Sequence, residues 1–470
     1  MVVHAWLAFV GVVWIPARAF WDLDLYRYWM WLGLHRGEWP VLSGPSVYPA
    51  GALVPMLLAS VAGTVGTAAY ATSWSVMITL LDALAMVALL HAPRLVRHGL
   101  AGGGDEPVPD DLPRRRTLLG AWWWLAFLLL LGPIAMGRLD AVVAPVTIAA
   151  LALALRHPRV ASVLLTIGAW IKVAPGALML PLFVSARRQW RDVVLPAAVV
   201  CVVVVVAVAL GGGAANIASF LTEQTSRGLQ IEAPGATPWL VWGLWSPSVT
   251  RFLDQEIITW EITGPGSGVA VDVLGWLMPL ALLASVALLW WRRERVGQGL
   301  WSDERADVEL LTRGSMLMVL VLLVFNKVGS PQYMGWLAAP VAVALALRLP
   351  RWRTTALVTL GIGLATQTVF PWHYDQVVGG VWPVTLVLAA RNAALVALLV
   401  LTVRELVRRP EDADAPLTDP RPAASLAGSP RRAPADPVAG PAGGSSRGRV
   451  GLGGGDERER RGVRRAVVDR

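Results

Sequence analysis

The sequence has little charge and almost no cysteine. Only 16% of its 470 residues are charged and 55% are hydrophobic, whereas soluble globular proteins carry roughly 25% charged residues. The mean hydropathy is correspondingly high, at +0.55. Cys201 is the single cysteine, which excludes a disulfide framework and a thiolate metal site within this chain. This composition predicts a polytopic membrane protein.

Several patterns that are typical of other protein classes are missing. The chain lacks the alternating segments of about ten residues found in outer-membrane barrels, and it contains neither an internal repeat nor a recognisable nucleotide-binding domain. Residues 1–13 are apolar but lack a basic leader and an Ala-x-Ala cleavage site, so we expect them to begin the first membrane helix. Apolar runs of about 18 or more residues recur instead, and these favour α-helices, which pair their own backbone polar groups.

The basic residues indicate how these helices are oriented. The net charge of +9 resides mainly in short loops and in the tail, as expected for cytoplasmic loops and not for nucleic-acid binding. With every basic cluster on one side, the chain has about 11–13 membrane segments. We therefore expect a multi-pass plasma-membrane protein with both termini in the cytoplasm. The expected spans include 3–20, 71–92, 117–136, 141–155, 192–211, 269–291, 309–325, 334–348, 354–370 and 381–402.

Segment 160–186 does not fit a single span. It is too long, it carries basic residues at both ends, and Lys172 and Pro175 lie in its middle. Because Pro175 cannot donate a backbone hydrogen bond, we expect two half-helices that meet near Lys172. Residues 50–66 are rich in alanine and glycine and suit an interfacial or re-entrant segment.

Two domains of different composition are expected. Residues 1–409 form an all-α integral membrane domain. Residues 410–470 are rich in proline, glycine and arginine and contain almost nothing that would build a core. We expect them to form a disordered cytoplasmic tail.

The functional prediction starts from two carboxylates at the end of the first apolar segment, where the chain is expected to leave the membrane. Asp22 and Asp24 lie just after the first apolar segment, among aromatic residues that include Trp21, Tyr26 and Tyr28. Tyrosine and tryptophan favour the interfacial depth of a bilayer. An acid at that depth is costly, which makes it a functional hypothesis by default. We predict an irregular loop over residues 21–47, because proline and glycine cluster in its second half.

Further polar residues are expected on the same outer face. Carboxylates and cations at one membrane level suit transfer of a sugar from a lipid-linked phosphosugar. A carboxylate accepts the proton of the attacking hydroxyl, and cations stabilise the phosphate as it leaves. The complete set is Asp22, Asp24, Arg138, Asp140, Lys172, Arg227, Gln230, Glu232, Asn326, Lys327, Gln332, Tyr333 and His373.

Most of these residues also have a structural interpretation. Asp22 or Asp24 would suit the N-cap of a following helix. Asp140 would equally suit a helix cap that pairs with Arg138, and Lys172 would suit a side chain that snorkels from a helix end. Loop folding or interfacial packing is the alternative for Arg227, Glu232, Gln332, Tyr333 and His373.

Three motifs resemble known enzymes. The pattern Asp-Leu-x-Leu-Tyr at 22–26, followed by Tyr-Pro at 48–49, resembles the polytopic GT-C glycosyltransferases. More narrowly, it resembles the actinobacterial polyprenol-phosphate-mannose-dependent mannosyltransferases of glycosyltransferase family 87, as does the region 137–188 with its Gly-Arg-Leu-Asp and Lys-x-x-Pro motifs. Residues 325–336 are similar to the Asn-Lys-Val…Ser-Gln-Tyr…Trp segment of the eukaryotic first GPI mannosyltransferase. That enzyme also has an Asp-x-Asp in its first lumenal loop, as here at 22–24.

The resemblance implies a GT-C-type bundle with an outward-facing site. It implies a polyprenyl-phosphate sugar donor, mannose above other sugars, and inverting transfer to an envelope glycolipid or glycan. By position, Asp22 corresponds to the general base, and Asp24 is the alternative base or an acceptor-positioning group. The candidates for the donor phosphate are Lys172, Arg138, Arg227 and Lys327.

Two chemical questions stay open in the sequence. A divalent metal on Asp22 and Asp24 is compatible with the two carboxylates, although base chemistry needs only one of them, and no cofactor is established. Many members of family 87 carry histidines after the Ser-Pro of the late outer loop, where this chain has Gln332 and Tyr333. A histidine-assisted base would therefore have to be His373.

Two other functions compete with the transferase hypothesis. A flippase for a lipid-linked sugar would also suit a broken helix, but such transporters place their polar site near the midplane between related halves. A non-catalytic assembly factor would leave the paired acids without a task. The transferase is therefore the favoured prediction, with a polyprenyl-phosphate sugar donor, a lipid or glycan acceptor and membrane lipids as partners, and no nucleic acid.

Overall fold

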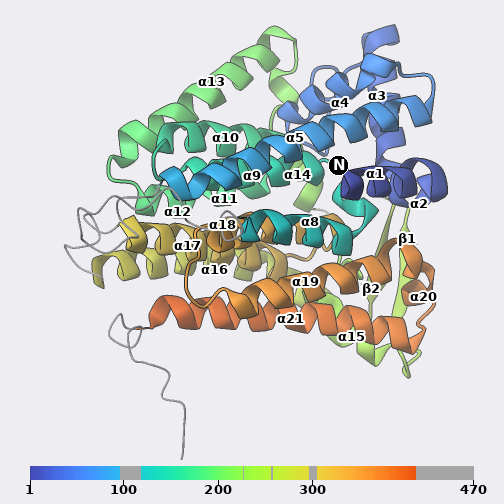
Figure 1. The fold of residues 1–470 in the computed structure, drawn as a ribbon. Helices are drawn as coiled ribbons and strands as arrows, with labels where there is room; N and C mark the ends of the chain where they lie inside the picture. Colours follow the sequence, from blue (N-terminus) through green and yellow to red (C-terminus); the bar gives the residue numbers. More distant parts are fainter. Residues whose placement is uncertain (96–117, 226, 256–257, 296–303, 409–470) are drawn as a thin grey trace, which may run out of the picture. The chain divides into compact units, whose positions relative to one another are not determined.

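The computed structural model describes residues 1–95, 118–225, 227–255, 258–295 and 304–408. These residues form a bundle of helices with one β-hairpin (Figure 1). The predicted all-α membrane fold is confirmed in these ranges. The expected disordered tail, 410–470, lies outside the described residues and stays a prediction.

The first quarter of the chain contains short helices and one long one. Its elements are α1 Val2–Phe9, η1 Val10–Trp14, α2 Pro16–Ala19, α3 Trp21–Arg36, η2 Ala50–Ala52, α4 Leu53–Ala59, η3 Ser60–Ala62 and α5 Thr67–Leu95. The prediction of an irregular loop after Phe20 is wrong for its first sixteen residues, because they form α3. The helix-breaking residues begin only at Gly37, which ends α3 with a φ of 73°, a conformation that glycine adopts without strain.

The middle of the chain confirms the predicted break at Lys172. Its elements are α8 Leu119–Leu131, η4 Pro133–Ala135, α9 Asp140–Leu153, α10 Pro158–Ile171, α11 Ala174–Ala177, α12 Met179–Ser185, η5 Trp190–Val194 and α13 Leu195–Leu210. α10 ends at Ile171 and the backbone of Lys172 is extended, with φ −152° and ψ 132°. Pro175 lies in the first turn of α11, where its missing N–H costs nothing.

The long segment after α13 contains most of the irregular structure. It holds η6 Ala214–Asn216, α14 Ser219–Thr225, η7 Pro234–Ala236, α15 Thr237–Trp242, β1 Thr250–Asp254 and β2 Thr259–Thr263. β1 and β2 pair antiparallel, with Phe252 opposite Glu261. This hairpin was not predicted from the sequence.

The part of the chain after the hairpin again contains long helices. They are α16 Ser267–Arg295, α17 Glu304–Val324, η8 Pro331–Leu337, α18 Ala338–Ala346, α19 Arg353–Gln367, η9 Thr368–Trp372, α20 Tyr374–Val378 and α21 Trp382–Val407. The sequence predicted the long members of this set to within a few residues. It did not separate η8 from α18, or η9 from α19.

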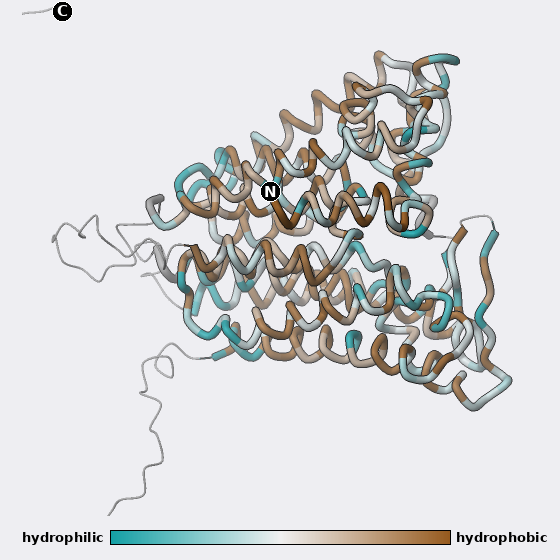
Figure 2. The backbone as a smooth tube through the Cα atoms, turned by 45° about the vertical axis from the view of Figure 1, so that its right-hand side comes forward, coloured by the Kyte–Doolittle hydropathy of each residue, from teal (hydrophilic) through white to brown (hydrophobic). Residues whose placement is uncertain are grey.

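Length and composition allow several helices to cross a membrane. In the described ranges, four helical segments are long and apolar enough: Thr67–Pro93, Trp190–Leu210, Ser267–Arg295 and Trp382–Val407. Their outer faces expose large apolar side chains, for example Val203 and Leu283, which suits contact with lipid. Figure 2 shows hydrophobic residues along the helices and hydrophilic residues gathered at the helix ends. The chain is therefore a membrane protein.

Helix α9 lies at the centre of this bundle. It contacts α5, α10 and α18, and most of its residues are buried. Its alanines let the neighbouring backbones approach closely, as small residues do between membrane helices. This packing fixes the position of both ends of α9, at Asp140 and at Leu153.

Candidate active site

Asp22 forms an ion pair with Arg138. The two residues lie in the first turn of α3 and in the loop before α9, and Arg138 Nε is 2.9 Å from Asp22 Oδ2. Arg138 also donates hydrogen bonds to the carbonyl oxygens of Ala19 and Gly137, at 3.3 and 3.1 Å. Its side chain is 8% exposed and that of Asp22 is 23% exposed. A buried, well-fixed cation is therefore paired with a carboxylate that solvent still reaches.

Gly137 allows this pair to form. A Cβ atom at this position would collide with the ring of Phe20 and lie 2.8 Å from the carbonyl oxygen of Ala19. The loop that carries Arg138 therefore packs directly against the chain just before Asp22. The glycine serves close approach here, and not a special backbone angle.

Lys172 lies at the break between α10 and α11, between two aromatic rings. Its Nζ is 4.9 Å from the ring centroid of Tyr48 and 5.2 Å from that of Tyr333, within the range of cation–π attraction. The same Nζ is 3.5 Å from Asp140 Oδ2. Trp336 Nε1 donates a 2.6 Å hydrogen bond to the other carboxylate oxygen of Asp140.

Two tyrosines connect the Asp22 pair to the Lys172 pair. The hydroxyl oxygens of Tyr26 and Tyr48 are 3.4 Å apart, and their rings meet edge to face with centroids 6.0 Å apart. Tyr26 lies one turn after Asp22 on α3, while Tyr48 is the residue beneath Lys172. Burial raises the pKa of the Tyr48 hydroxyl above its ordinary value, so this group stays neutral at physiological pH.

The structure corrects two interpretations of these acids. α3 begins at Trp21 with Phe20 as its N-cap and no side-chain cap bond, so neither Asp22 nor Asp24 is a cap. Asp140 is the first residue of α9, and no side chain caps that helix either. The prediction that Asp140 pairs with Arg138 is also wrong, because its partner is Lys172.

Asp24 faces different partners from Asp22. Its Oδ1 accepts hydrogen bonds from Arg27 Nε at 2.8 Å and from Thr67 Oγ1 at 2.7 Å, and its side chain is 52% exposed. Burial raises the pKa of Asp24, but the hydrogen bonds from Thr67 and Arg27 outweigh this and lower it overall. Residues two apart on a helix do not share a face, so Asp22 and Asp24 do not fit as joint ligands of one metal ion.

A metal centre is not evident elsewhere in the described ranges. Among those residues, no group of three or more histidine, cysteine, aspartate or glutamate side chains is arranged to hold a metal ion. The charged groups around Tyr48 are instead two carboxylates and two cations. The chemistry that this set offers is proton acceptance and anion binding.

A second cluster surrounds Glu261 on β2. The N–H of Gly228 donates a 2.9 Å hydrogen bond to Glu261 Oε1, and the charges of Lys327 and Arg227 act on the same carboxylate. Burial nevertheless raises the pKa of Glu261 above its ordinary value. The backbone N–H of Gln230 donates to the carbonyl oxygen of Lys327 at 3.0 Å. Three of the predicted residues therefore meet around an acid that was not predicted.

Glu232 has a structural partner. Arg391 Nη1 donates to Glu232 Oε2 at 2.8 Å, and Arg391 Nη2 donates to the backbone oxygen of Glu232 at 2.7 Å. The Arg391 side chain is completely buried and also donates to Asn392. This network anchors the long segment to α21.

The remaining predicted residues make local hydrogen bonds. Asn326 Oδ1 accepts a 2.9 Å bond from the N–H of Val328, and Gln332 Oε1 accepts a 2.6 Å bond from Ser330. His373 Nδ1 lies 2.7 Å from the carbonyl oxygen of Thr368. The first two bonds shape the loop that leads to Tyr333, while His373 lies between η9 and α20 and not in the Tyr48 cluster.

Sequence reasoning missed three residues of these clusters, namely Tyr48, Trp336 and Glu261, as direct participants. Trp336 follows Tyr333 by three positions in the 3₁₀ helix η8, where such side chains lie above one another; their rings stack with centroids 4.4 Å apart. The lysine count offered another signal. Lys172 and Lys327 are the only lysines in the sequence among 41 basic residues, and each lies in one of the two clusters.

A family model described as glycosyltransferase family 87 matches residues 47–302, which include Tyr48, Arg138, Asp140, Lys172 and Glu261. No curated protein and no solved structure matches the chain. Because the family match covers more than half of the sequence, the chain belongs to glycosyltransferase family 87 and is a membrane glycosyltransferase.

Proposed function

We propose that this glycosyltransferase transfers mannose from a polyprenyl-phosphate donor to a glycolipid or glycan acceptor of the cell envelope. The reaction takes place on the non-cytoplasmic face of the plasma membrane, in a GT-C-type bundle with both termini in the cytoplasm. The observation that carries the proposal is the cluster around Tyr48, in which a solvent-accessible carboxylate, Asp22, lies beside buried cations. The identity of the sugar rests on the resemblance of the motifs, and the cluster supports the type of reaction.

Asp22 acts as the general base in this mechanism. It accepts the proton of an acceptor hydroxyl while the oxygen attacks the anomeric carbon of the sugar. The bond between the anomeric carbon and the phosphate oxygen breaks on the opposite side, which inverts the configuration. The bonding electrons leave with the polyprenyl phosphate.

Arg138 and Lys172 bind the phosphate. Arginine and lysine stabilise the negative charge that develops on the leaving oxygen. Each cation already faces one carboxylate, at 2.9 Å for Arg138 and 3.5 Å for Lys172, so the cluster is electrically balanced before the donor arrives. A guanidinium has five donors, which lets Arg138 hold a phosphate oxygen while it orients Asp22. Arg227 and Lys327, around Glu261, supply further positive charge for the donor or for an anionic acceptor.

A transfer assay tests the proposal. Membranes that contain the chain are incubated with radiolabelled polyprenyl-phosphate mannose, and label is followed into lipid and glycan fractions. We expect transfer that depends on the chain, with release of polyprenyl phosphate. Membranes that never incorporate label from mannose, arabinose or glucose donors would contradict the assignment of the donor class.

A flippase is the second candidate, because α10 is interrupted at Lys172 and broken helices are common in transporters. Purified protein in liposomes distinguishes the two. Movement of the labelled donor between leaflets without a glycosylated product would favour the flippase, whereas product formation without such movement favours the transferase.

A further inference from the structure

A cavity of about 550 Å³ lies far from the Tyr48 cluster. α9 runs from Asp140 to Leu153, and α10 runs back from Pro158 to Ile171. The cavity is lined by the connection between these helices, residues 154–157, and by the first turn of α10, residues 158–160. At 1.5 Å per residue, a 14-residue helix spans about 20 Å. The cavity therefore lies at the opposite end of the two helices that carry Asp140 and Lys172.

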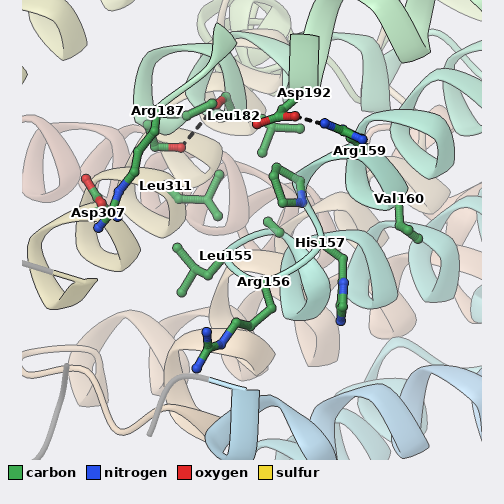
Figure 3. Close-up of a pocket in the computed structure, with 14 residues that line it drawn as sticks. Leu155, Arg156, His157, Arg159, Val160, Leu182, Arg187, Asp192, Asp307 and Leu311 are labelled. Carbon is green, nitrogen blue, oxygen red and sulfur yellow. Dashed lines mark hydrogen bonds and ion pairs between the residues drawn. The ribbon is translucent and has the colours of Figure 1, made fainter. Parts of the chain in front are cut away.

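The lining of this cavity is cationic on one part and apolar on another. Figure 3 shows Arg156, Arg159 and Arg187 on different sides of it. Two carboxylates also contribute, Asp192 and Asp307, and Arg159 Nε is 2.8 Å from Asp192 Oδ1. Three guanidinium groups therefore face two carboxylates, which leaves a net positive charge. The apolar part of the wall comes from Leu155, Leu182 and Leu311.

The cavity lies at the level of a membrane surface. One membrane-spanning segment begins at Trp190, three residues after Arg187, and its first turn supplies the lining residue Asp192. Trp190 is 74% exposed, and apolar residues further along the same helix, such as Val199, are exposed as well. Tryptophan at the start of a lipid-facing helix marks the headgroup region. A ligand at this level lies among the lipid headgroups and the first carbons of the acyl chains.

The helix start at Pro158 adds to the positive potential. α10 has fourteen residues with Pro158 at its first position, and Pro158, Arg159 and Val160 all line the cavity. The N–H groups in the first turn of a helix have no partner within the helix, and they favour an anion.

We propose that this cavity binds the phosphate of an anionic membrane lipid. The phosphate diester is held by Arg156 and Arg187, because arginine presents a planar fork that matches phosphate oxygens. The glycerol and the first carbons of the acyl chains lie along the leucine wall. A free phosphate would use the arginines but not this wall, whereas basic pockets between membrane helices commonly hold lipid headgroups. The site is separate from the Tyr48 cluster and does not depend on the mechanism proposed for it.

Native mass spectrometry of the full-length protein in detergent tests this site. The probes are phosphatidylglycerol, phosphatidylcholine as the neutral lipid, and glycerol 3-phosphate as the soluble headgroup. We expect the wild type to retain phosphatidylglycerol over phosphatidylcholine and to bind glycerol 3-phosphate far more weakly. The variant R156Q/R187Q should lose about tenfold or more in phosphatidylglycerol affinity, because it removes two charge-assisted contacts.

Arg188→Gln is the matched control. Arg188 is the exposed neighbour of Arg187 and does not line the cavity, so this variant should retain phosphatidylglycerol like the wild type. Arg187→Lys keeps the charge and should retain an intermediate amount, because lysine binds a phosphate oxygen without the planar fork of arginine. Equal loss in R188Q and R156Q/R187Q would indicate general surface attraction and would overturn the site. Glycerol 3-phosphate that binds as tightly as phosphatidylglycerol would replace the lipid with a soluble phosphate and would also overturn the proposal.

Discussion

Arg138 and Asp22 are 116 residues apart in the sequence, yet their side chains form a 2.9 Å ion pair. The pair joins the first turn of α3 to the loop before α9, and Tyr26 and Tyr48 connect it to Lys172 and Asp140. A phosphate that binds Arg138 shares this cation with Asp22, because the guanidinium has several donors. In the proposed mechanism, donor binding therefore weakens the ion pair while Arg138 still orients the carboxylate that accepts the proton.

Replacement of Asp22 by asparagine should abolish sugar transfer. The amide keeps the shape of the side chain but does not accept a proton, and the loss of a general base lowers turnover by about 10²–10⁴-fold. The measurement is initial transfer rate in membranes that contain equal amounts of each protein. Asp22→Glu, which restores a carboxylate, should recover part of the rate.

Asp24→Asn is the matched control for that experiment. It lies two residues away and bonds only to Arg27 and Thr67 among the contacts described above. Because exposed ion pairs contribute about 0–1 kcal/mol, this variant should fold normally and keep its transfer rate within a few-fold. Loss of activity in D24N together with full activity in D22N would move the base to Asp24.

Replacement of Lys172 by methionine should reduce both stability and activity, and a double variant separates the two effects. K172M leaves Asp140 without its cation, and an unpaired buried charge costs about 3–5 kcal/mol. In K172M/D140N the charge balance returns, and the asparagine oxygen still accepts the hydrogen bond from Trp336. We expect thermal stability to recover in the double variant while transfer stays low. Recovery of transfer as well would mean that Lys172 serves only to pair with Asp140.

Local rules account for part of this structure. Pro175 and the basic residues at both ends of 160–186 were enough to predict the break at Lys172, because proline interrupts a helix in any surroundings. The start of α3 was missed because the proline and glycine clusters beyond Gly37 dominated the interpretation of the whole loop. The absence of helix breakers between Trp21 and Leu32 was the signal that should have separated the two halves.

The pairing of charges followed no local rule. Asp140 lies two residues from Arg138 in the sequence, and that proximity suggested an ion pair that the structure does not have. The direction of the first turn of α9 sends Asp140 to Lys172 and Trp336, while Arg138 lies against α3. Which acid pairs with which base depends on how the helices pack. That packing is decided by contacts between residues far apart in the sequence. Glu261 was missed for a different reason. The β-hairpin that carries it is short and mixed in polarity, so its strands have no clear sequence pattern.

Alanine at Gly329 should disturb the loop that carries Lys327 and Tyr333. A Cβ atom there would collide with the backbone N–H of Ala233, and backbone cannot move aside as a flexible side chain can. We expect a lower midpoint of thermal unfolding and a fall in transfer rate for G329A. Intrinsic fluorescence of the 24 tryptophans reports the unfolding.

Gly335→Ala provides the matched control in the same segment. A Cβ atom at Gly335 meets nothing within 4 Å, so this variant should unfold like the wild type and keep its activity. If G335A and G329A behaved alike, the contact between this loop and Ala233 would not be what positions Tyr333 and Lys327.

Replacement of Glu261 by glutamine should change how stability depends on pH. Burial raises the pKa of Glu261 above 4.5 in the folded protein, so folding favours the protonated form. Its contribution to stability is complete below the unfolded pKa and is lost as pH rises through the folded value. Glutamine mimics the protonated acid and still accepts the hydrogen bond from Gly228. In E261Q, stability should therefore fall less than in the wild type as pH rises from about 4.5, and at neutral pH the variant should be at least as stable. The midpoint of thermal unfolding in detergent, measured at several pH values, checks this. A variant that becomes less stable at neutral pH would show that Lys327 and Arg227 hold Glu261 in its charged form.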